Sequence, residues 1–159
     1  MIQVLILYTS STGNTEEIAE LLKKELDQNV FNITLEALEM GNIDSHHLLE
    51  YDGILFGTYT YDDGDLPFET DIFCDVLRTV NMTGKVVGVF GSGDTAYNQF
   101  CSAVDLMKVE FKQQHAETIQ HTVKIDLYPD EEEDFQSIKK LATEFQQTAL
   151  NAFTTKKVE

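Results

Sequence analysis

Short apolar runs alternate with amphipathic segments along the whole chain, and this alternation limits the possible folds more than any other feature. The first run consists of Ile2, Val4, Leu5, Ile6 and Leu7 with Gln3 as its one polar residue, as expected for a strand covered on both faces. The segments that follow the runs carry apolar residues at helical spacing. The pattern therefore predicts βαβ units and an α/β fold. The predicted strands are residues 2–8, 30–38, 53–56, 86–90 and 119–127.

Three of the five predicted strands are followed by unusual polar loops, namely the first, the third and the fourth. With right-handed crossovers, we expect a three-layer doubly wound sandwich around a five-stranded parallel sheet of order 2-1-3-4-5. In this order the three strands are neighbours, so their carboxyl ends share one edge. Doubly wound sheets bind ligands at that edge, where the strand order reverses. We therefore expect one domain, residues 1–159, with a ligand site formed by these loops.

The first loop, residues 9–15, has the composition of an anion site. The first N–H groups of the predicted helix 15–27 lack partners within the helix, and its dipole adds partial positive charge. No Lys or Arg precedes Lys23, and neither the nucleoside triphosphate loop nor G-x-G-x-x-G is present. A phosphate monoester held by neutral donors fits best, although simple helix capping is an alternative. The candidates are Ser10, Ser11, Thr12, Gly13, Asn14 and Thr15.

The second loop, residues 57–67, and the third loop, residues 91–97, each carry aromatic side chains. Their tyrosines are Tyr59, Tyr61 and Tyr97. Two rings brought from opposite sides could enclose a flat heterocycle, each stack adding about 0.5–1.5 kcal/mol. Gly91 and Gly93 would let the backbone approach its edge, and Asp94 could accept a hydrogen bond from a ring N–H. Half-buried packing is the alternative for each tyrosine taken singly.

Together, the three loops resemble those of the flavodoxin family, and the resemblance covers essentially the full chain. The first loop matches T-x-S/T-T-G-N-T, and the second reads G-T-Y-T-Y-D-D-G-D-L-P. The third reads G-S-G-D-T-A-Y and is followed by F-C-x-A-V-D. Because no long insertion divides the fifth predicted strand, the chain resembles the short-chain branch. The resemblance implies a flavodoxin-like fold with non-covalent FMN, a monophosphate with a planar tricyclic ring.

The family's pattern also implies roles for individual residues. Residues 10–15 would bind the phosphate, while Thr58 and Thr60 would lie near the ribityl chain and the ring. Tyr97 would stack on the outer face of the ring and Tyr61 on the inner face. Backbone groups of Asp94 and Cys101 would meet the pyrimidine edge. The remaining cofactor-binding candidates are Tyr59, Asp62, Asp63, Ser92 and Gly93.

Two residues of the second loop depart from the pattern of many relatives. Tyr61 stands where Trp is common, and Asp62 stands where Gly is common. In the family, the peptide beside this Gly turns over on one-electron reduction, and the turned form needs positive φ. Asp adopts positive φ less readily than Gly. We therefore expect the one-electron-reduced flavin to be less stabilised here than in an Asp62→Gly variant, which a reductive titration would test.

The function that the resemblance implies is that of a low-potential one-electron carrier without a substrate of its own. Its partners would be a basic-faced NADPH-dependent flavodoxin/ferredoxin reductase and acceptor enzymes. Two alternatives use the same fold: a flavin-dependent quinone or nitro reductase, and an activator module for a partner such as a ribonucleotide reductase. A signalling receiver domain fits poorly, because Tyr8-Thr9 and Gly57-Thr58 occupy the positions where it needs acidic residues.

The net charge of −17 is concentrated, with thirteen acidic residues and no Lys or Arg between Glu25 and Leu77. Such a field repels nucleic acid and attracts basic proteins. Around the ring, acidic side chains would also lower the potential of the flavin; solvated faces that keep the protein soluble are the alternative. We expect a monomeric cytoplasmic protein with reduced cysteines, no metal site and no membrane partner. The acidic residues expected around the ring are Asp62, Asp63, Asp65, Glu69 and Asp94.

Overall fold

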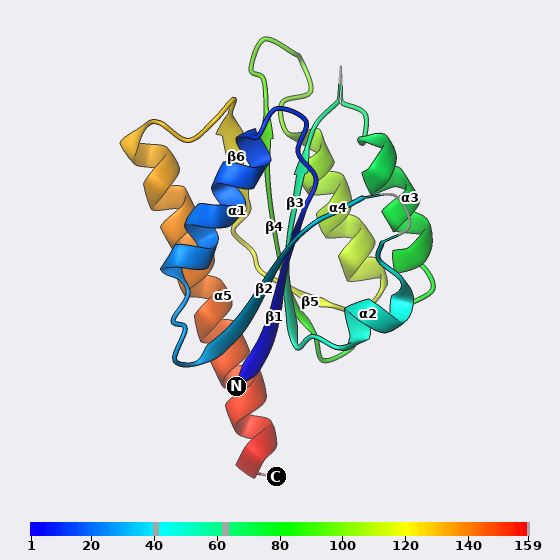
Figure 1. Ribbon diagram of the computed structural model, residues 1–159, viewed down its shortest axis with the longest axis vertical. Helices are drawn as coiled ribbons and strands as arrows, with labels where there is room; N and C mark the ends of the chain where they lie inside the picture. The colour runs from blue at the N-terminus through cyan, green and yellow to red at the C-terminus, as the bar shows by residue number, and fades with distance from the viewer. Residues whose placement is uncertain (40–41, 62–63, 159) are drawn as a thin grey trace.

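The computed structural model describes residues 1–39, 42–61 and 64–158, and in it a parallel sheet lies between two layers of helices (Figure 1). The strand order is β2-β1-β3-β4-β5, with β6 also paired to β4, and every pairing between the strands is parallel. This confirms the predicted doubly wound order 2-1-3-4-5. The strands are β1 Ile2–Tyr8, β2 Phe31–Ala37, β3 Gly53–Tyr59, β4 Val86–Gly93, β5 Glu117–Thr118 and β6 Val123–Asp126.

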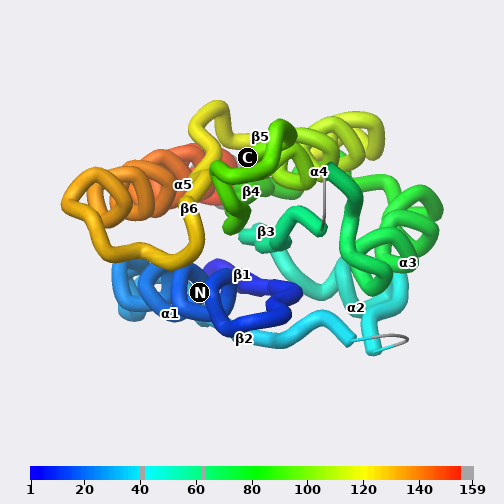
Figure 2. The backbone as a smooth tube through the Cα atoms, turned by 90° about the horizontal axis from the view of Figure 1, so that it is seen from above, coloured from blue at the N-terminus to red at the C-terminus, as the bar shows by residue number. Residues whose placement is uncertain are grey.

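Each face of the sheet is covered by its own helices, as the view along the sheet shows (Figure 2). On one face, α1 and α5 bury Ile18, Leu141 and Phe145. On the other, α2, α3 and α4 close a second core, in which Phe56 stacks on Phe73 at 4.9 Å between ring centroids. Within the described residues, no helix combines the length and apolar character of a membrane span. The helices are α1 Asn14–Glu25, α2 Ser45–Leu49, α3 Phe68–Leu77, α4 Ser102–Gln113 and α5 Glu132–Val158.

The fifth predicted strand, residues 119–127, is in fact two short strands, β5 and β6, that pair with different parts of β4. Between the two pairings β4 advances from Val87 to Phe90, whereas the edge strand advances from Thr118 to Val123. The edge strand thus carries two additional residues. An edge strand has one unpaired side and can therefore bulge outward at little cost to the sheet. The predicted boundaries were wrong here because Ile119 and the alternating residues Val123, Ile125 and Leu127 lie close enough in the sequence to be taken as one strand.

Two central strands run further than predicted, so part of each predicted loop is strand. β3 continues to Tyr59 and β4 continues to Gly93, with Thr58 opposite Gly91 and Tyr59 opposite Ser92. A Cβ at Gly91 would lie 2.2 Å from the Thr58 carbonyl oxygen and 2.5 Å from Val104 Cγ2. Gly91 is therefore required for packing within the protein, a different role from the predicted approach to a ligand.

Candidate functional site

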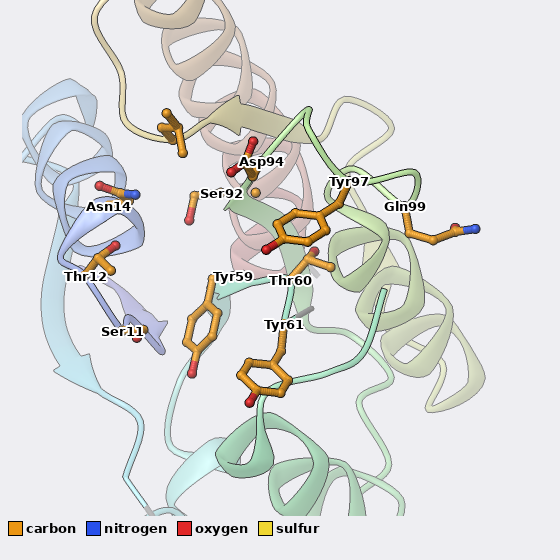
Figure 3. A pocket seen from close by; sticks show the side chains of 12 residues that line it. Ser11, Thr12, Asn14, Tyr59, Thr60, Tyr61, Ser92, Asp94, Tyr97 and Gln99 are labelled. Atoms are coloured by element: carbon orange, nitrogen blue, oxygen red, sulfur yellow. The ribbon is translucent and has the colours of Figure 1, made fainter. Parts of the chain in front are cut away.

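A cavity of about 250 Å³ lies at the carboxyl edge of the sheet, where the loops after β1, β3 and β4 meet (Figure 3). Ten of the predicted site residues line it. Two further residues, Gln99 and Leu127, were not predicted. The structure therefore brings all three predicted loops to one cavity. The predicted residues in its lining are Ser11, Thr12, Asn14, Tyr59, Thr60, Tyr61, Ser92, Gly93, Asp94 and Tyr97.

The remaining candidates are not part of this lining. Asp62 and Asp63 lie outside the described residues. Five others lie within two residues of a lining residue in the chain, and the bonds of several of them support the walls. These five are Ser10, Gly13, Thr15, Thr58 and Cys101.

One end of the cavity, which we call the hydroxyl end, is formed by Ser11, Thr12 and Asn14 at the start of α1. Gly13 precedes the helix with φ +89°, and nothing lies within 4 Å of the position its Cβ would take. The Ser10 hydroxyl oxygen accepts a hydrogen bond from the Gly13 N–H at 3.0 Å. Ser10 therefore shapes the loop from within while the glycine takes the left-handed conformation that such a turn needs.

A buried hydrogen bond connects the hydroxyl end to the sheet. Thr15 Oγ1 and Ser92 Oγ lie 2.8 Å apart, and both side chains are buried. At the start of the loop, the Thr9 N–H donates to the Gly57 carbonyl at 3.0 Å. The Thr9 hydroxyl donates to Glu69 Oε1 at 3.1 Å. The loop is thus held on both sides by β3, β4 and α3.

The chemistry of the hydroxyl end suits an anion that is held without a cation. The first turn of α1 presents backbone N–H groups, and the lining adds two hydroxyls and one amide. No Lys or Arg occurs among the residues that line the cavity. Glu16 and Glu17 in the first turn of α1 would repel an anion. The attraction must therefore come from short-range hydrogen bonds and the helix dipole.

The opposite end, which we call the tyrosine end, is formed by Tyr59, Tyr61 and Tyr97, whose rings surround the opening (Figure 3). Tyr61 is held by an antiparallel bridge to Asp65, with N···O distances of 2.8 and 2.9 Å. The Tyr97 N–H donates to the Asp94 carbonyl at 3.0 Å, which closes the turn that carries the third ring. The rings of Tyr61 and Tyr97 are about half exposed. They offer aromatic faces that the protein itself does not cover.

The second loop is fixed against α4 by two side-chain hydrogen bonds. The Thr60 hydroxyl oxygen accepts from the Ala103 N–H at 3.2 Å and so caps the first turn of α4. The Ser102 hydroxyl donates to the Gly64 carbonyl at 3.3 Å. Thr58, in contrast, directs its hydroxyl toward α3, 3.1 Å from Thr70 Oγ1. The side chain of Thr58 is thus engaged within the protein, and Thr60 is the threonine that lines the cavity.

Burial raises the pKa of two groups beside the cavity, Tyr59 and Cys101. It raises the pKa of the Tyr59 hydroxyl, and the nearby charge of Glu69 raises that pKa further. Burial also raises the pKa of the Cys101 thiol to about 12, so the thiol stays protonated and unreactive at neutral pH. Among the described residues, no group of three or more His, Cys, Asp or Glu side chains is arranged to hold a metal. Cys74 and Cys101 are free.

Of the two lining residues that were missed, only Leu127 has a signal in the sequence that could have identified it. Leu127 directly follows β6, and a parallel fifth strand must end at the same edge as the other strands. Its backbone has φ +62°, and its N–H donates to the Gly93 carbonyl at 2.8 Å. Positive φ at a leucine has no local sequence signal. Gln99 lies within the irregular segment before α4, where periodicity carries no information.

Comparisons with known proteins agree with this geometry. The sequence profile of the Flavodoxin family matches residues 6–140. The chain is 38% identical to "Probable flavodoxin 1" of Bacillus subtilis over 145 residues, which cover 91% of this chain and 90% of that protein. Oxidised Flavodoxin 2 from Bacillus cereus is similar in structure, with a TM-score of 0.86 at 43% identity, covering 92% of this chain and 99% of the other. A short-chain flavodoxin associated with a non-canonical PDU bacterial microcompartment gives 0.86 at 35% identity, with coverages of 94% and 99%.

Proposed function

Because the chain belongs to the flavodoxin family, whose members are FMN-dependent electron carriers rather than enzymes, we propose that it carries single electrons at low potential with one non-covalently bound FMN in the cavity. The observation that carries this proposal is the contrast between the two ends of one cavity. One end offers neutral hydrogen-bond donors at a helix N-terminus, and the other offers uncovered aromatic faces. A ligand that matches both has a phosphate at one end and a flat ring at the other.

The residues present fit FMN at each end. Ser11, Thr12, Asn14 and the N–H groups of the first turn of α1 would hold the phosphate. Tyr61 and Tyr97 would cover the two faces of the ring. The bound FMN supplies the electron chemistry, while the protein supplies binding, orientation and electrostatic tuning. Asp94 and Glu69 lie near the tyrosine end and would disfavour added negative charge.

The size of this electrostatic tuning follows from Coulomb's law. A carboxylate about 10 Å from an added electron raises its energy by roughly 1.7 kcal/mol at an effective dielectric constant of about 20. For a one-electron couple this lowers the potential by about 70 mV per charge, before screening by salt. A few such charges make the reduced protein a strong reductant. We infer that its partners are basic-faced redox proteins, namely an NADPH-dependent reductase of the flavodoxin/ferredoxin type and acceptor enzymes.

Titration of the FMN-free protein with FMN and with riboflavin, which lacks the phosphate, tests the assignment of the hydroxyl end. Quenching of flavin fluorescence gives both dissociation constants. We expect FMN to bind at least about tenfold more tightly, because several hydrogen bonds to a charged phosphate are lost with riboflavin. The FMN affinity should rise with ionic strength, because salt screens the repulsion from Glu16, Glu17 and the net charge of −17. A protein that takes up neither flavin would overturn the proposal.

A matched pair of variants locates the phosphate. Thr12→Val removes a hydroxyl from the hydroxyl end, whereas Thr154→Val removes the hydroxyl of another exposed threonine from the far part of α5. We expect Thr12→Val to weaken FMN binding about three- to tenfold and to leave riboflavin binding unchanged. Thr154→Val should change neither.

Stepwise anaerobic reduction of the FMN-loaded protein then tests the carrier function, since the spectrum should pass through a one-electron-reduced form.

A further inference from the structure

Beside the cavity, two hollows of about 390 and 490 Å³ share Gly64, Asp65 and Leu106 and form one continuous depression between α3 and α4. We call it the α3–α4 groove. Phe68 and Asp71 of α3 stand on one side, and Leu106 and Val109 of α4 stand on the other. The groove meets the cavity at both hollows, because Gln99 lines one hollow and the cavity, and Tyr61 lines the other hollow and the cavity.

The groove exposes apolar side chains that the fold leaves uncovered. Phe68 is 65% exposed, Val109 51% and Leu106 47%. Single exposed apolar residues are normal on protein surfaces, but large ones gathered around one hollow are typical of binding surfaces. Directly beneath, Phe73, Met107 and Phe111 form the buried core of this side of the sheet. The exposed groove residues are therefore additional to the core.

The charged residues that line the groove are all acidic. Its lining includes Asp65, Asp71 and Asp105 and contains no Lys or Arg. The nearby cations are engaged in other contacts. Arg78 at the end of α3 pairs with Glu110 at 2.7 Å, and Lys124 pairs with Asp105 at 2.8 Å. The Lys108 ammonium donates to the Gln120 carbonyl at 2.8 Å. An apolar floor with an acidic border is thus complementary to an apolar projection bordered by Lys and Arg.

We propose that the α3–α4 groove is the docking surface for the protein's electron-transfer partners, and that it takes a protein face with an apolar centre and a basic border. This inference rests on the proposed function, since it assigns the partner's position relative to the same cavity. A partner seated in the groove abuts Tyr61 and Gln99 at the cavity opening. The acidic border supplies long-range attraction, and Phe68, Leu106 and Val109 supply short-range contact. A second copy of this chain is disfavoured, because its own groove carries the same charge.

Amide NMR shifts of the FMN-loaded protein, titrated with a basic c-type cytochrome, test the position of the surface. This probe exposes an apolar haem edge within a ring of lysines, the chemistry that the groove predicts. We expect the largest shifts in residues 64–71 and 99–109. Largest shifts in α1, or in the segment from Leu127 to Phe135, would overturn the proposal, because those residues border other sides of the cavity or lie away from it.

Two matched pairs of variants separate the apolar and the electrostatic contributions. Leu106→Asn is compared with Leu49→Asn on α2, since the two leucines are 47% and 46% exposed. Asp71→Asn is compared with Glu25→Gln, which makes the same change of net charge at the far end of α1. We expect Leu106→Asn to weaken binding of the cytochrome about five- to tenfold at both 20 and 150 mM salt. Asp71→Asn should weaken it about two- to threefold at the lower salt and less at the higher. Each control should stay within about a factor of two.

The outcomes distinguish this inference from the proposed function. If Leu106→Asn and Leu49→Asn bind the cytochrome equally well, the groove is not the docking surface, even when FMN binds normally. If the purified protein fails to bind FMN, the proposed function fails first. Leu106 does not line the cavity, so the FMN affinity of Leu106→Asn should equal that of the unaltered protein. A loss of FMN affinity in this variant would show disturbance of the fold and contradict the assignment of Leu106 to the groove alone.

Discussion

The two ends of the cavity are held in place by different means. At the hydroxyl end, buried or internal hydrogen bonds fix the backbone, above all the bond between Thr15 and Ser92 and the contact of Ser10 with the Gly13 N–H. At the tyrosine end, the backbone turns are fixed, but the side chains of Tyr61 and Tyr97 project half exposed. The hydroxyl end is thus organised by the protein alone, whereas the tyrosine end is completed by whatever the rings contact.

This difference predicts whether a substitution will change the stability of the fold or the affinity for the ligand. A change among the buried bonds of the hydroxyl end, or among the strand residues beneath the tyrosine end, should lower the free energy of unfolding. A change in an exposed ring should lower ligand affinity and leave stability nearly untouched. The four predictions below test this division, from the largest expected effect to the smallest.

Two glycines near the cavity, Gly91 in β4 and Gly13 before α1, serve different purposes, and substitution by alanine distinguishes these purposes. A Cβ at Gly91 would meet the Thr58 carbonyl oxygen and Val104, neither of which can move without shifting a strand or a helix. We expect Gly91→Ala to lower the free energy of unfolding by about 3 kcal/mol or more, as severe overpacking does. Gly13→Ala, where space is open but φ is +89°, should cost only about 1 to 2 kcal/mol. Urea unfolding of the FMN-free proteins measures both. Equal costs would show that packing at Gly91 is not the deciding factor.

The hydrogen bond between Thr15 and Ser92 joins the hydroxyl end to β4 through the interior. Thr15→Val keeps the shape of the side chain and leaves the buried Ser92 hydroxyl without its partner. We expect a loss of about 1 to 3 kcal/mol in the free energy of unfolding. The double variant Thr15→Val/Ser92→Ala removes both polar groups, so its loss should be smaller than the sum of the single losses. Additive losses in urea unfolding would mean that the two hydroxyls do not stabilise each other.

Much of this arrangement was predictable from the sequence, because it depends on periodicity and on topology. Apolar runs and helical stripes indicated the strand order, and parallel strands necessarily end at one edge. The prediction that the loops at residues 9–15, 57–67 and 91–97 would meet followed from these two points alone. Ten of the predicted residues accordingly line one cavity.

The rest depends on contacts between distant parts of the chain. Nothing local to Gly91 indicates that Thr58 and Val104 occupy the space beside it. The positive φ of Leu127 is set by a bond to Gly93 and not by a residue type that favours that conformation. Ser10 and Thr15 have the right composition for a ligand site, yet the structure uses both hydroxyls for internal bonds. Whether they also contact a phosphate remains a prediction.

Alkaline pH should act through the buried Cys101 thiol, which lies beside Gly93 of the cavity wall, whereas residues 9–15 contain no titratable side chain. Burial raises the pKa of the Cys101 thiol from 9.0 to about 12, so above pH 9 the unfolded chain releases a proton that the folded protein retains. The thiol's contribution to stability is therefore complete below pH 9 and falls as pH rises. Between pH 9 and 10 the free energy of unfolding should decrease by about 1 kcal/mol more than in Cys101→Ala. Urea unfolding with a reductant present measures this difference. Parallel curves for the two proteins would contradict it.

The smallest effect on stability, and the sharpest contrast with the hydroxyl end, is expected for Tyr97. Its ring is 50% exposed and makes up part of the cavity wall, whereas Tyr128 is 54% exposed and is not part of that wall. Tyr97→Leu and Tyr128→Leu should each change the free energy of unfolding of the FMN-free protein by less than about 0.5 kcal/mol. Only Tyr97→Leu should weaken FMN binding, by about three- to tenfold, since it removes one stacking partner worth about 0.5–1.5 kcal/mol. Fluorescence titration would give the affinities. Equal affinities for the two variants would mean that the exposed ring does not cover the flavin, and the division of the cavity into a self-organised end and a ligand-completed end would then be wrong.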